Sequence, residues 1–125
     1  MAEKICLDTD VCISIIKGLD KADKISDLIG SMKLFVTSVT VFELYLRKEN
    51  LDEVADFLDG IFILDFNEDC AKKASNIGKE LKANGITIEI RDIFIASIAI
   101  TNNCALATFN NKHFSKIKGL ELFKF

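Results

Sequence analysis

The sequence predicts an α/β domain in which helices cover both faces of a parallel β-sheet. Short apolar runs that could form strands alternate along the 125 residues with longer segments of helical periodicity, which is the pattern of βαβ units. Two acidic residues directly follow the first apolar run, and the carboxyl edge of such a sheet is where ligands bind. We expect one domain over residues 1–125, because a chain of this length can bury one core.

The first strand is expected at residues 5–7, since three consecutive apolar residues indicate burial on both faces of a sheet. Asp8 and Asp10 follow at once, and a helix over residues 11–17 should end at Gly18. Either acid could simply cap this helix. We favour that interpretation for Asp10 but not for Asp8, because further acids occur in matching places later in the chain.

The later elements alternate in the same way. Further strands are expected at residues 34–36, 61–64, 105–107 and 120–123. Helices are expected at residues 20–29 with Gly30 as the stop, 39–48, 51–58, from Asn67 or Asp69 to about 84, and 93–100. The last helix is apolar on all sides, so it should be buried against the sheet.

Composition narrows the class of protein. No apolar run reaches the roughly 18 residues of a membrane span, and the N-terminus shows no signal-peptide pattern, so we expect a cytoplasmic protein without a membrane partner. The net charge of −3 argues against a large electropositive nucleic-acid surface but leaves room for a local one. Four cysteines without a C-x-x-C pair indicate core residues in a reducing compartment.

Four oxygen-bearing side chains occupy matching positions. Asp8 follows the first strand, Glu43 lies in the first turns of the helix after the second strand, Asp92 begins the buried helix, and Asn110 follows the fourth strand. In a parallel sheet all four fall on one edge. Oxygen ligands of this kind are typical of a hard divalent cation such as Mg²⁺ or Mn²⁺.

Each member of this set also has a purely structural explanation. Thr40 and Glu43 have the spacing of a capping box. Asp92 could favour the positive end of its helix, and Asn110 with Asn111 could form a turn. If all of these structural explanations held, four oxygen-bearing side chains would lie on one edge of the sheet by coincidence. A shared metal site explains their common position more simply.

Four ordered segments resemble the motifs of PIN-domain ribonucleases, and most closely those of the VapC toxins of prokaryotic toxin–antitoxin pairs. They are residues 7–11, 38–44, 92–99 and 107–114, and the similarity continues through residues 119–122. Their order, spacing and total length carry the resemblance together. It implies a PIN-like three-layer fold with about five parallel strands in the order 3-2-1-4-5. It also implies Mg²⁺-dependent RNA cleavage, a homodimer and a cognate antitoxin of VapB type.

The resemblance assigns roles residue by residue. Asp8, Glu43 and Asp92 match the three acids of the family and are the expected metal ligands. Asn110 stands where many members have a fourth acid, so the departure puts a second metal in doubt. Asp10 occupies a position often held by Asn or Ser.

Other residues are expected to support the site. Thr9 and Ser38 fall on hydroxyl positions that the family uses for this purpose, and Thr108 is a third candidate. Glu89 is a further candidate ligand, although it could equally cap its helix. His113 is expected at the surface or in a turn rather than as an acid–base catalyst. Basic residues that could contact RNA phosphates near the edge are Arg91, Lys112, Lys116, Lys118 and Lys33, although ordinary solvated surface is the better interpretation for at least two of them.

The expected mechanism is attack on phosphorus by a water that the metal activates, with Asp92 or Glu43 taking the proton. Two alternatives remain open. Asp8 and Asp10 after a buried strand resemble the opening motif of haloacid-dehalogenase-type phosphotransfer enzymes, although Cys12 stands where Thr or Val is expected. A catalytically silent, partner-binding PIN-like domain is the other.

Ten phenylalanines are many for one core of this size, so some should form an exposed apolar interface and support a homodimer. The candidates are Phe42, Tyr45, Leu46, Phe57, Phe123 and Phe125. An antitoxin should block the acids with an Arg bound to Glu43 or Asp92. The apolar part of its tail should lie in a groove near Ile13, Ile16, Leu44 or Leu46.

Overall fold

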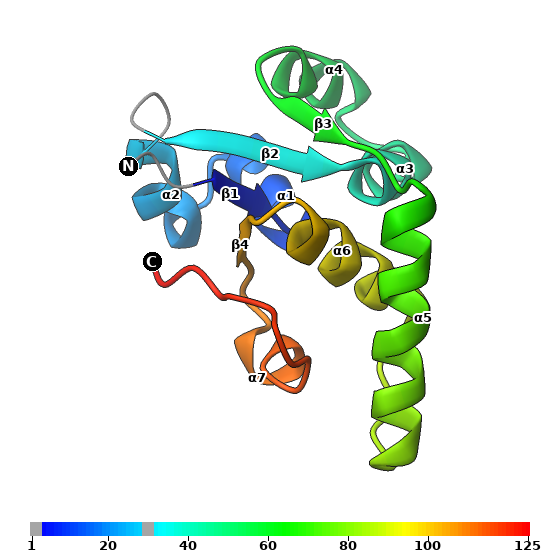
Figure 1. The fold of residues 1–125 in the computed structure, drawn as a ribbon. Helices are drawn as coiled ribbons and strands as arrows, with labels where there is room; N and C mark the ends of the chain where they lie inside the picture. Colours follow the sequence, from blue (N-terminus) through cyan, green and yellow to red (C-terminus); the bar gives the residue numbers. More distant parts are fainter. Residues whose placement is uncertain (1–3, 29–31) are drawn as a thin grey trace.

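The computed structural model describes residues 4–28 and 32–125, and its centre is a parallel sheet of four strands (Figure 1). The strands are β1 (Lys4–Leu7), β2 (Lys33–Thr37), β3 (Phe62–Leu64) and β4 (Ala105–Ala107), in the order β3-β2-β1-β4. Every pairing is parallel. The predicted α/β class is therefore confirmed, and all the carboxyl ends of the strands lie at one edge.

The predicted fifth strand is reduced to a single bridge. Leu122 pairs with Leu106 in parallel, so the segment lies where strand five of the order 3-2-1-4-5 was expected. Leu106 donates its N–H to Glu121 and accepts one from Phe123, both over 2.8 Å. Because β4 has only three residues, Leu106 alone makes this pairing in the described part of the chain.

The first helix begins earlier than expected because Asp8 is its cap. Helix α1 spans Thr9–Lys17, and Oδ1 of Asp8 accepts the N–H of Thr9 over 2.9 Å. It ends at Gly18, which has a φ of 67° in the left-handed region that suits glycine. The assignment of the cap to Asp10 was therefore wrong.

The helix expected over residues 20–29 is divided into a 3₁₀ turn, η1 (Asp20–Ala22), and α2 (Asp23–Leu28). The expected stop at Gly30 lies outside the described residues. Helix α3 (Ser38–Leu46) is capped by Thr37, whose hydroxyl accepts the N–H of Thr40 over 3.0 Å. The capping box of Thr40 and Glu43 was therefore wrong, because the helix begins before Thr40.

The remaining helices follow the predicted pattern with shifted ends. They are α4 (Leu51–Asp59), α5 (Glu68–Ala83), α6 (Ile90–Thr101) and α7 (Asn111–Phe114). Asn67 caps α5 as expected, by accepting the N–H of Cys70. Helix α6 begins three residues earlier than predicted and is fully buried only over residues 95–99. The short α7 was not predicted.

Two hydrophobic clusters cover the two faces of the sheet. Ile5 and Leu7 of β1 belong to the cluster with α1 and α4, whereas Cys6 between them belongs to the cluster with α5 and α6. This alternation is the two-residue period of a strand buried on both faces. Figure 1 shows α1 and α6 on opposite sides of the sheet. All four cysteines are free and buried, as predicted.

The exposed apolar side chains agree only in part with prediction. Phe42, Tyr45 and Leu46 of α3 are 54%, 47% and 61% exposed. Phe57, Phe123 and Phe125 are partly buried against the core, so their place in the patch was wrong. No helix in the described part of the chain is long and apolar enough to cross a membrane.

The groove expected for an antitoxin tail also needs correction. Leu44 is fully buried in the core and offers no surface to a partner. Ile13 and Ile16 are partly buried and pack on the same cluster. Of the four residues named for the groove, only Leu46 is strongly exposed.

Candidate active site at the carboxyl edge of the sheet

Asp8 is fixed between the ends of β1 and β4. Its N–H donates to the carbonyl oxygen of Ala107 over 2.9 Å. Its Oδ2 accepts the hydroxyl hydrogen of Thr108 over 2.7 Å, and its Oδ1 accepts the N–H of Thr9. The side chain of Asp8 is thus held at the edge where strands β1 and β4 end, as the sequence predicts.

The pKa of Asp8 is raised to about 7. Burial is the largest cause, and the charges of Asp10 and Asp92 also raise the pKa, while the hydrogen bonds from Thr108 and Thr9 lower it. The residue is only 6% exposed. A carboxylate that has lost its hydration and faces other acids favours a proton or a nearby cation. Asp8 therefore has the electrostatic surroundings of a cation ligand.

Asp10 connects α1 to the segment after β4. Its Oδ2 accepts the N–H of Phe109 over 3.2 Å. Its Oδ1 is buried and has no hydrogen-bond partner within residues 4–28 and 32–125. Burial is the main cause that raises the pKa of Asp10, and the hydrogen bond from Phe109 lowers it.

Glu43 is held by a row of threonine hydroxyls. Its Oε1 accepts the hydroxyl hydrogen of Thr9 over 2.7 Å. The Thr9 hydroxyl lies 3.0 Å from that of Thr40, which in turn accepts from Thr37 over 3.4 Å. Thr40 is a site residue that the sequence analysis missed, because it considered Thr40 only as one end of a possible capping box with Glu43.

The hydroxyl of Ser38 has a different partner. It accepts the N–H of Phe66 over 3.2 Å and so holds the loop before α5. In the described part of the chain it makes no hydrogen bond to an acid of the site. Thr9 and Thr108 therefore lie against the acids as expected, whereas Ser38 does not.

Asp92 is paired with His113, which the sequence analysis assigned to the surface or a turn. The Nε2 atom of His113 lies 3.0 Å from Oδ2 of Asp92. Burial is the main cause that raises the pKa of Asp92, with contributions from Glu89 and Asp10, whereas His113 lowers it. Helix α7, which the sequence analysis did not predict, brings His113 to this position. The sequence signal for this helix is Asn110, whose carbonyl oxygen accepts the N–H groups of His113 and Phe114.

Arg91 lies among the acids at the start of α6. Its Nε donates to Oε1 of Glu89 over 2.8 Å, and its Nη1 lies 3.6 Å from Oε2 of Glu43. Glu89 is exposed and, within the described residues, its side chain does not cap α6. The structure thus places Arg91 at the acidic edge, the edge of the sheet that carries Asp8, Glu43 and Asp92, and Glu89 holds it there.

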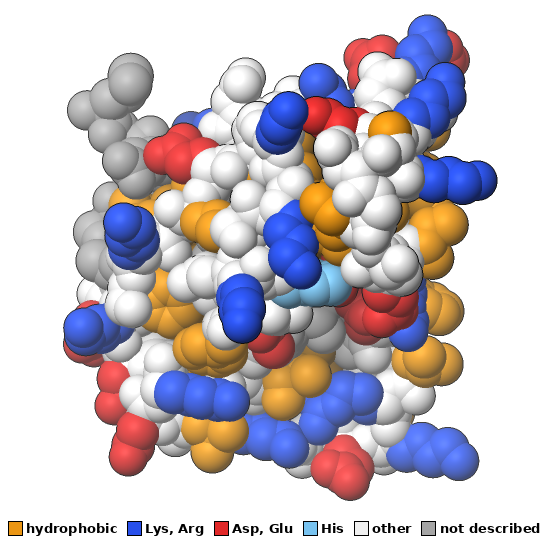
Figure 2. All heavy atoms as spheres, turned by 90° about the horizontal axis from the view of Figure 1, so that it is seen from below, with side chains coloured by type: hydrophobic (Ala, Val, Ile, Leu, Met, Phe, Trp, Pro, Cys, Tyr) orange, Lys and Arg blue, Asp and Glu red, His pale blue; other side chains and the backbone are white. Residues whose placement is uncertain are grey.

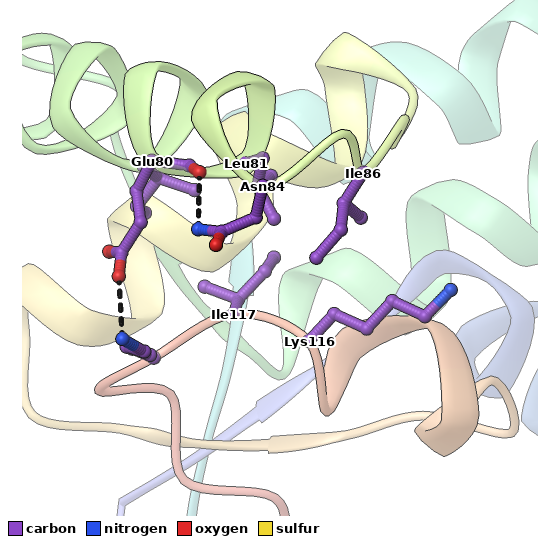
Figure 3. Close-up of a pocket in the computed structure, with 8 residues that line it drawn as sticks. Glu80, Leu81, Asn84, Ile86, Lys116 and Ile117 are labelled. Atoms are coloured by element: carbon purple, nitrogen blue, oxygen red, sulfur yellow. Dashed lines mark hydrogen bonds and ion pairs between the residues drawn. The ribbon is translucent and has the colours of Figure 1, made fainter.

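The predicted lysines lie in other surroundings. Lys33 is the first residue of β2, so it is at the opposite edge of the sheet and its placement near the site was wrong. Lys118 pairs with Glu80 over 3.0 Å. Lys116 and Lys118 line a cavity of about 420 Å³ beside the end of α5. Figure 3 shows Lys116 and Ile117 on one side of this cavity and Leu81 on the other.

The charges on the face of Figure 2 are mixed. The single histidine of the chain is visible at this surface with basic and acidic side chains near it, and the Lys and Arg side chains are scattered rather than gathered. This distribution agrees with the net charge of −3.

The side chain of Asn110 is exposed. Its backbone N–H donates to the Thr108 hydroxyl over 3.0 Å. Among the residues that the structure describes, its side chain makes no hydrogen bond to an acid of the site. Asn110 therefore contributes to the site through its backbone, which supports the threonine that binds Asp8.

The donor set fits a hard divalent cation in its chemistry. Within residues 4–28 and 32–125, no three His, Cys, Asp or Glu side chains form a preformed metal centre. The available donors are carboxylate and hydroxyl oxygens, which suit Mg²⁺ or Mn²⁺. The raised pKa of Asp8 and the unpaired buried oxygen of Asp10 both indicate that positive charge would stabilise this edge.

Comparison with known proteins gives consistent matches. A model of the PIN domain family matches residues 5–120. Ribonuclease VapC2 of Haemophilus influenzae is 32% identical over 126 residues, which cover 94% of each chain. The tRNA(fMet)-specific endonuclease VapC of Shigella flexneri is 28% identical, again over 94% of each chain.

Solved structures agree. The crystal structure of VapBC2 from Rickettsia felis bound to a promoter DNA fragment matches with a TM-score of 0.87 and 28% identity, over 98% of both chains. The DNA-bound VapBC structure from Salmonella typhimurium matches with a TM-score of 0.84 and 26% identity, over 98% of both chains.

Proposed function

Because the chain belongs to the PIN-domain family, we propose that it is the toxin of a VapBC-type pair and uses Mg²⁺ held by Asp8, Glu43 and Asp92 to cleave RNA. Its class, an endoribonuclease of the VapC type, follows from relatives matched over more than nine-tenths of both chains. Mn²⁺ could replace Mg²⁺, since the donors suit both. We propose that residues 1–125 form one such domain.

The observation that carries the proposal is the environment of Asp8. This carboxylate is almost fully buried, receives hydrogen bonds on both oxygens and faces Asp10 and Asp92. Such an arrangement is costly without a cation, because like charges repel strongly where water is excluded. A structural cap alone would not require several acids at one edge.

When bound, the cation would polarise the phosphate and lower the pKa of a water. Thr9 and Thr108 hold Asp8, and Thr9 also orients Glu43 through its hydroxyl. Glu43 or Asp92 would accept the proton. Since His113 engages Oδ2 of Asp92, the other Asp92 oxygen remains to bind the cation or to accept the proton.

The proposed contacts with RNA, with an antitoxin and with a second copy of the chain each involve different side chains. Arg91 is the basic side chain best placed to contact an RNA phosphate, with Lys112 and Lys116 as further candidates. A VapB-type antitoxin would block the acids with an arginine, and Phe42, Tyr45 and Leu46 would form the surface of a homodimer.

The alternative of a phosphotransfer enzyme is wrong, because the matched family is the PIN domain and the relatives are ribonucleases.

The alternative of a catalytically silent PIN-like domain is separated from the proposal by an RNA cleavage assay. Purified chain should cleave RNA with Mg²⁺ and stop when the metal is chelated. Asp92→Asn should be inactive, and Lys33→Ala should retain activity because Lys33 is at the opposite edge. A folded, Mg²⁺-binding chain that cleaves no RNA would support the silent domain.

A further inference from the structure

One carboxylate oxygen at the acidic edge has no protein partner. Asp10 lies in the first turn of α1, two residues after Asp8, and its Oδ2 accepts the N–H of Phe109 over 3.2 Å. Its Oδ1 is buried without a donor in the described part of the chain. Buried polar atoms normally have partners, since an unpaired one loses its hydration without compensation.

The charged groups around Asp10 do not supply that partner. Asp8 and Asp92 are close enough to interact with Asp10 electrostatically, and both are acids. A side-chain hydrogen bond with Asp8 lowers the pKa of Asp10, but two carboxyl groups can form it only while one of them holds a proton. The basic residue that interacts with it is Lys21. The Nζ atom of Lys21 lies 4.8 Å from the centre of the Phe109 ring, in a cation–π contact, and within the described residues it makes no hydrogen bond to Asp10. When both carboxyl groups are ionised, a bound cation is the partner that this oxygen lacks.

Asp10 also lies beside the segment that carries Asn110. The N–H that Asp10 accepts belongs to Phe109, the residue directly before Asn110. The Asn110 side chain is itself exposed, and only its backbone is linked to the acids, through Thr108. Asp10 and Asn110 are therefore neighbouring candidates for a fourth oxygen ligand. Of the two, Asp10 has a buried oxygen without a partner, whereas the side chain of Asn110 is exposed.

We propose that Asp10, and not Asn110, supplies the fourth oxygen ligand of the cation bound by Asp8, Glu43 and Asp92, through its Oδ1 atom. This inference rests on the proposed cation site and goes beyond it by assigning a ligand on α1. The acidic edge then still has four carboxylates, because Asp10 supplies the one that Asn110 lacks. The hydrogen bond from Phe109 fixes Asp10 before the cation arrives.

The test is calorimetric titration of Mg²⁺ into purified chain without RNA. Asp10→Asn keeps an oxygen that can accept the Phe109 N–H, removes the charge and replaces the other carboxylate oxygen by an NH₂ group that cannot bind a cation. It should weaken Mg²⁺ binding tenfold or more. Asn110→Ala should stay within about twofold of the wild type, as should the matched control Glu80→Gln, which removes an exposed acid that pairs with Lys118. An Asp10→Asn chain with wild-type affinity would overturn the proposal.

A second measurement does not depend on the variants folding. In the wild type, Mg²⁺ should shift the carboxyl ¹³C resonance of Asp10 together with those of Asp8 and Asp92. An Asp10 resonance that stays in place while the other two move would identify a structural acid and overturn the inference.

The two proposals fail in distinguishable ways. If the wild type binds no Mg²⁺, the cation site and this inference fail together. If the wild type binds Mg²⁺ and cleaves RNA, and Asp10→Asn binds Mg²⁺ equally well, only the role of Asp10 is overturned.

Discussion

The Nε2 atom of His113 lies 3.0 Å from Oδ2 of Asp92, so helix α7 is joined to the first turn of α6. The next residue, Phe114, is 1% exposed and anchors α7 in the core. The backbone that carries His113 is therefore held in place, and His113 engages Oδ2 of Asp92. The other carboxylate oxygen of Asp92 remains available to a ligand.

Replacing Asp92 by Asn should abolish nuclease activity without destabilising the metal-free protein. The Asn oxygen can still accept a hydrogen from His113, while repulsion from Glu89 and Asp10 disappears. The melting temperature in chelator should be unchanged or raised, with a gain of up to about 1 kcal/mol in the free energy of unfolding. Mg²⁺ should also stabilise the variant less than the wild type. A clear loss of metal-free stability would show that Asp92 is a structural cap.

The stability of the metal-free protein should fall as pH rises. The pKa of folded Asp8 is about 7, above its ordinary value of about 3.9, so the folded chain binds this proton more tightly than the unfolded chain. The contribution is fully present below about pH 4 and is lost as pH rises through about 7. Each tenfold difference in proton affinity between the folded and unfolded chains corresponds to about 1.4 kcal/mol.

Thermal or urea unfolding at a series of pH values, in chelator, measures this dependence. The decline should be smaller in Asp8→Asn, in which the raised pKa values of Asp10 and Asp92 still contribute. Mg²⁺ should stabilise the wild type more at pH 8 than at pH 5, because the acids are then ionised. A wild type and an Asp8→Asn variant with the same pH dependence would contradict the raised pKa.

The Thr9 hydroxyl should matter for catalysis through Glu43. Thr9→Val keeps the shape of the side chain but removes the donor that lies 2.7 Å from Oε1 of Glu43. Removal of such an orienting group typically lowers activity or metal affinity roughly 10–100-fold. Ser38→Ala is the matched control, since its hydroxyl accepts from Phe66 instead. Equal activity losses in both variants would indicate that Thr9 acts only on folding.

The apolar surface of α3 should mediate a symmetric homodimer. Sedimentation of the wild type at micromolar concentration should show a dimer, and Leu46→Glu should shift it to monomer, because a charge would be buried at the interface. Leu19→Glu is the control, since Leu19 is also exposed but follows α1. A monomeric wild type in the absence of any partner would count against the interface.

Mg²⁺ and a cognate antitoxin should compete for the acidic edge. An antitoxin arginine bound to Glu43 or Asp92 would use the oxygens that the cation needs, so rising Mg²⁺ should weaken the complex. By linkage, the antitoxin should weaken Mg²⁺ binding by the same factor. The measurement is complex affinity against Mg²⁺ at fixed ionic strength. A flat response would rule out direct occlusion and leave steric or allosteric inhibition.

The sequence by itself determined the sheet and the position of its main acids. Three apolar residues before Asp8 required a strand buried on both faces, and the alternation of strands with helices required parallel pairing. Asp8 follows β1, Glu43 lies in the helix after β2, and Asp92 lies in the first turn of α6. These are consequences of local pattern, because side-chain periodicity and chain order already dictate which ends of the strands share an edge.

Tertiary structure decided which groups contact one another at that edge. Thr108 reaches Asp8 across 100 positions of the chain, and His113 reaches Asp92 across 21. Neither contact has a local signal, because it depends on how β4 and α7 pack against β1 and α6. The same holds for Asp10, whose expected role as a cap is replaced by a hydrogen bond from Phe109, 99 positions away. A hydrogen bond needs its two atoms within about 3 Å, and only the packed fold fixes such a distance between residues so far apart in the chain.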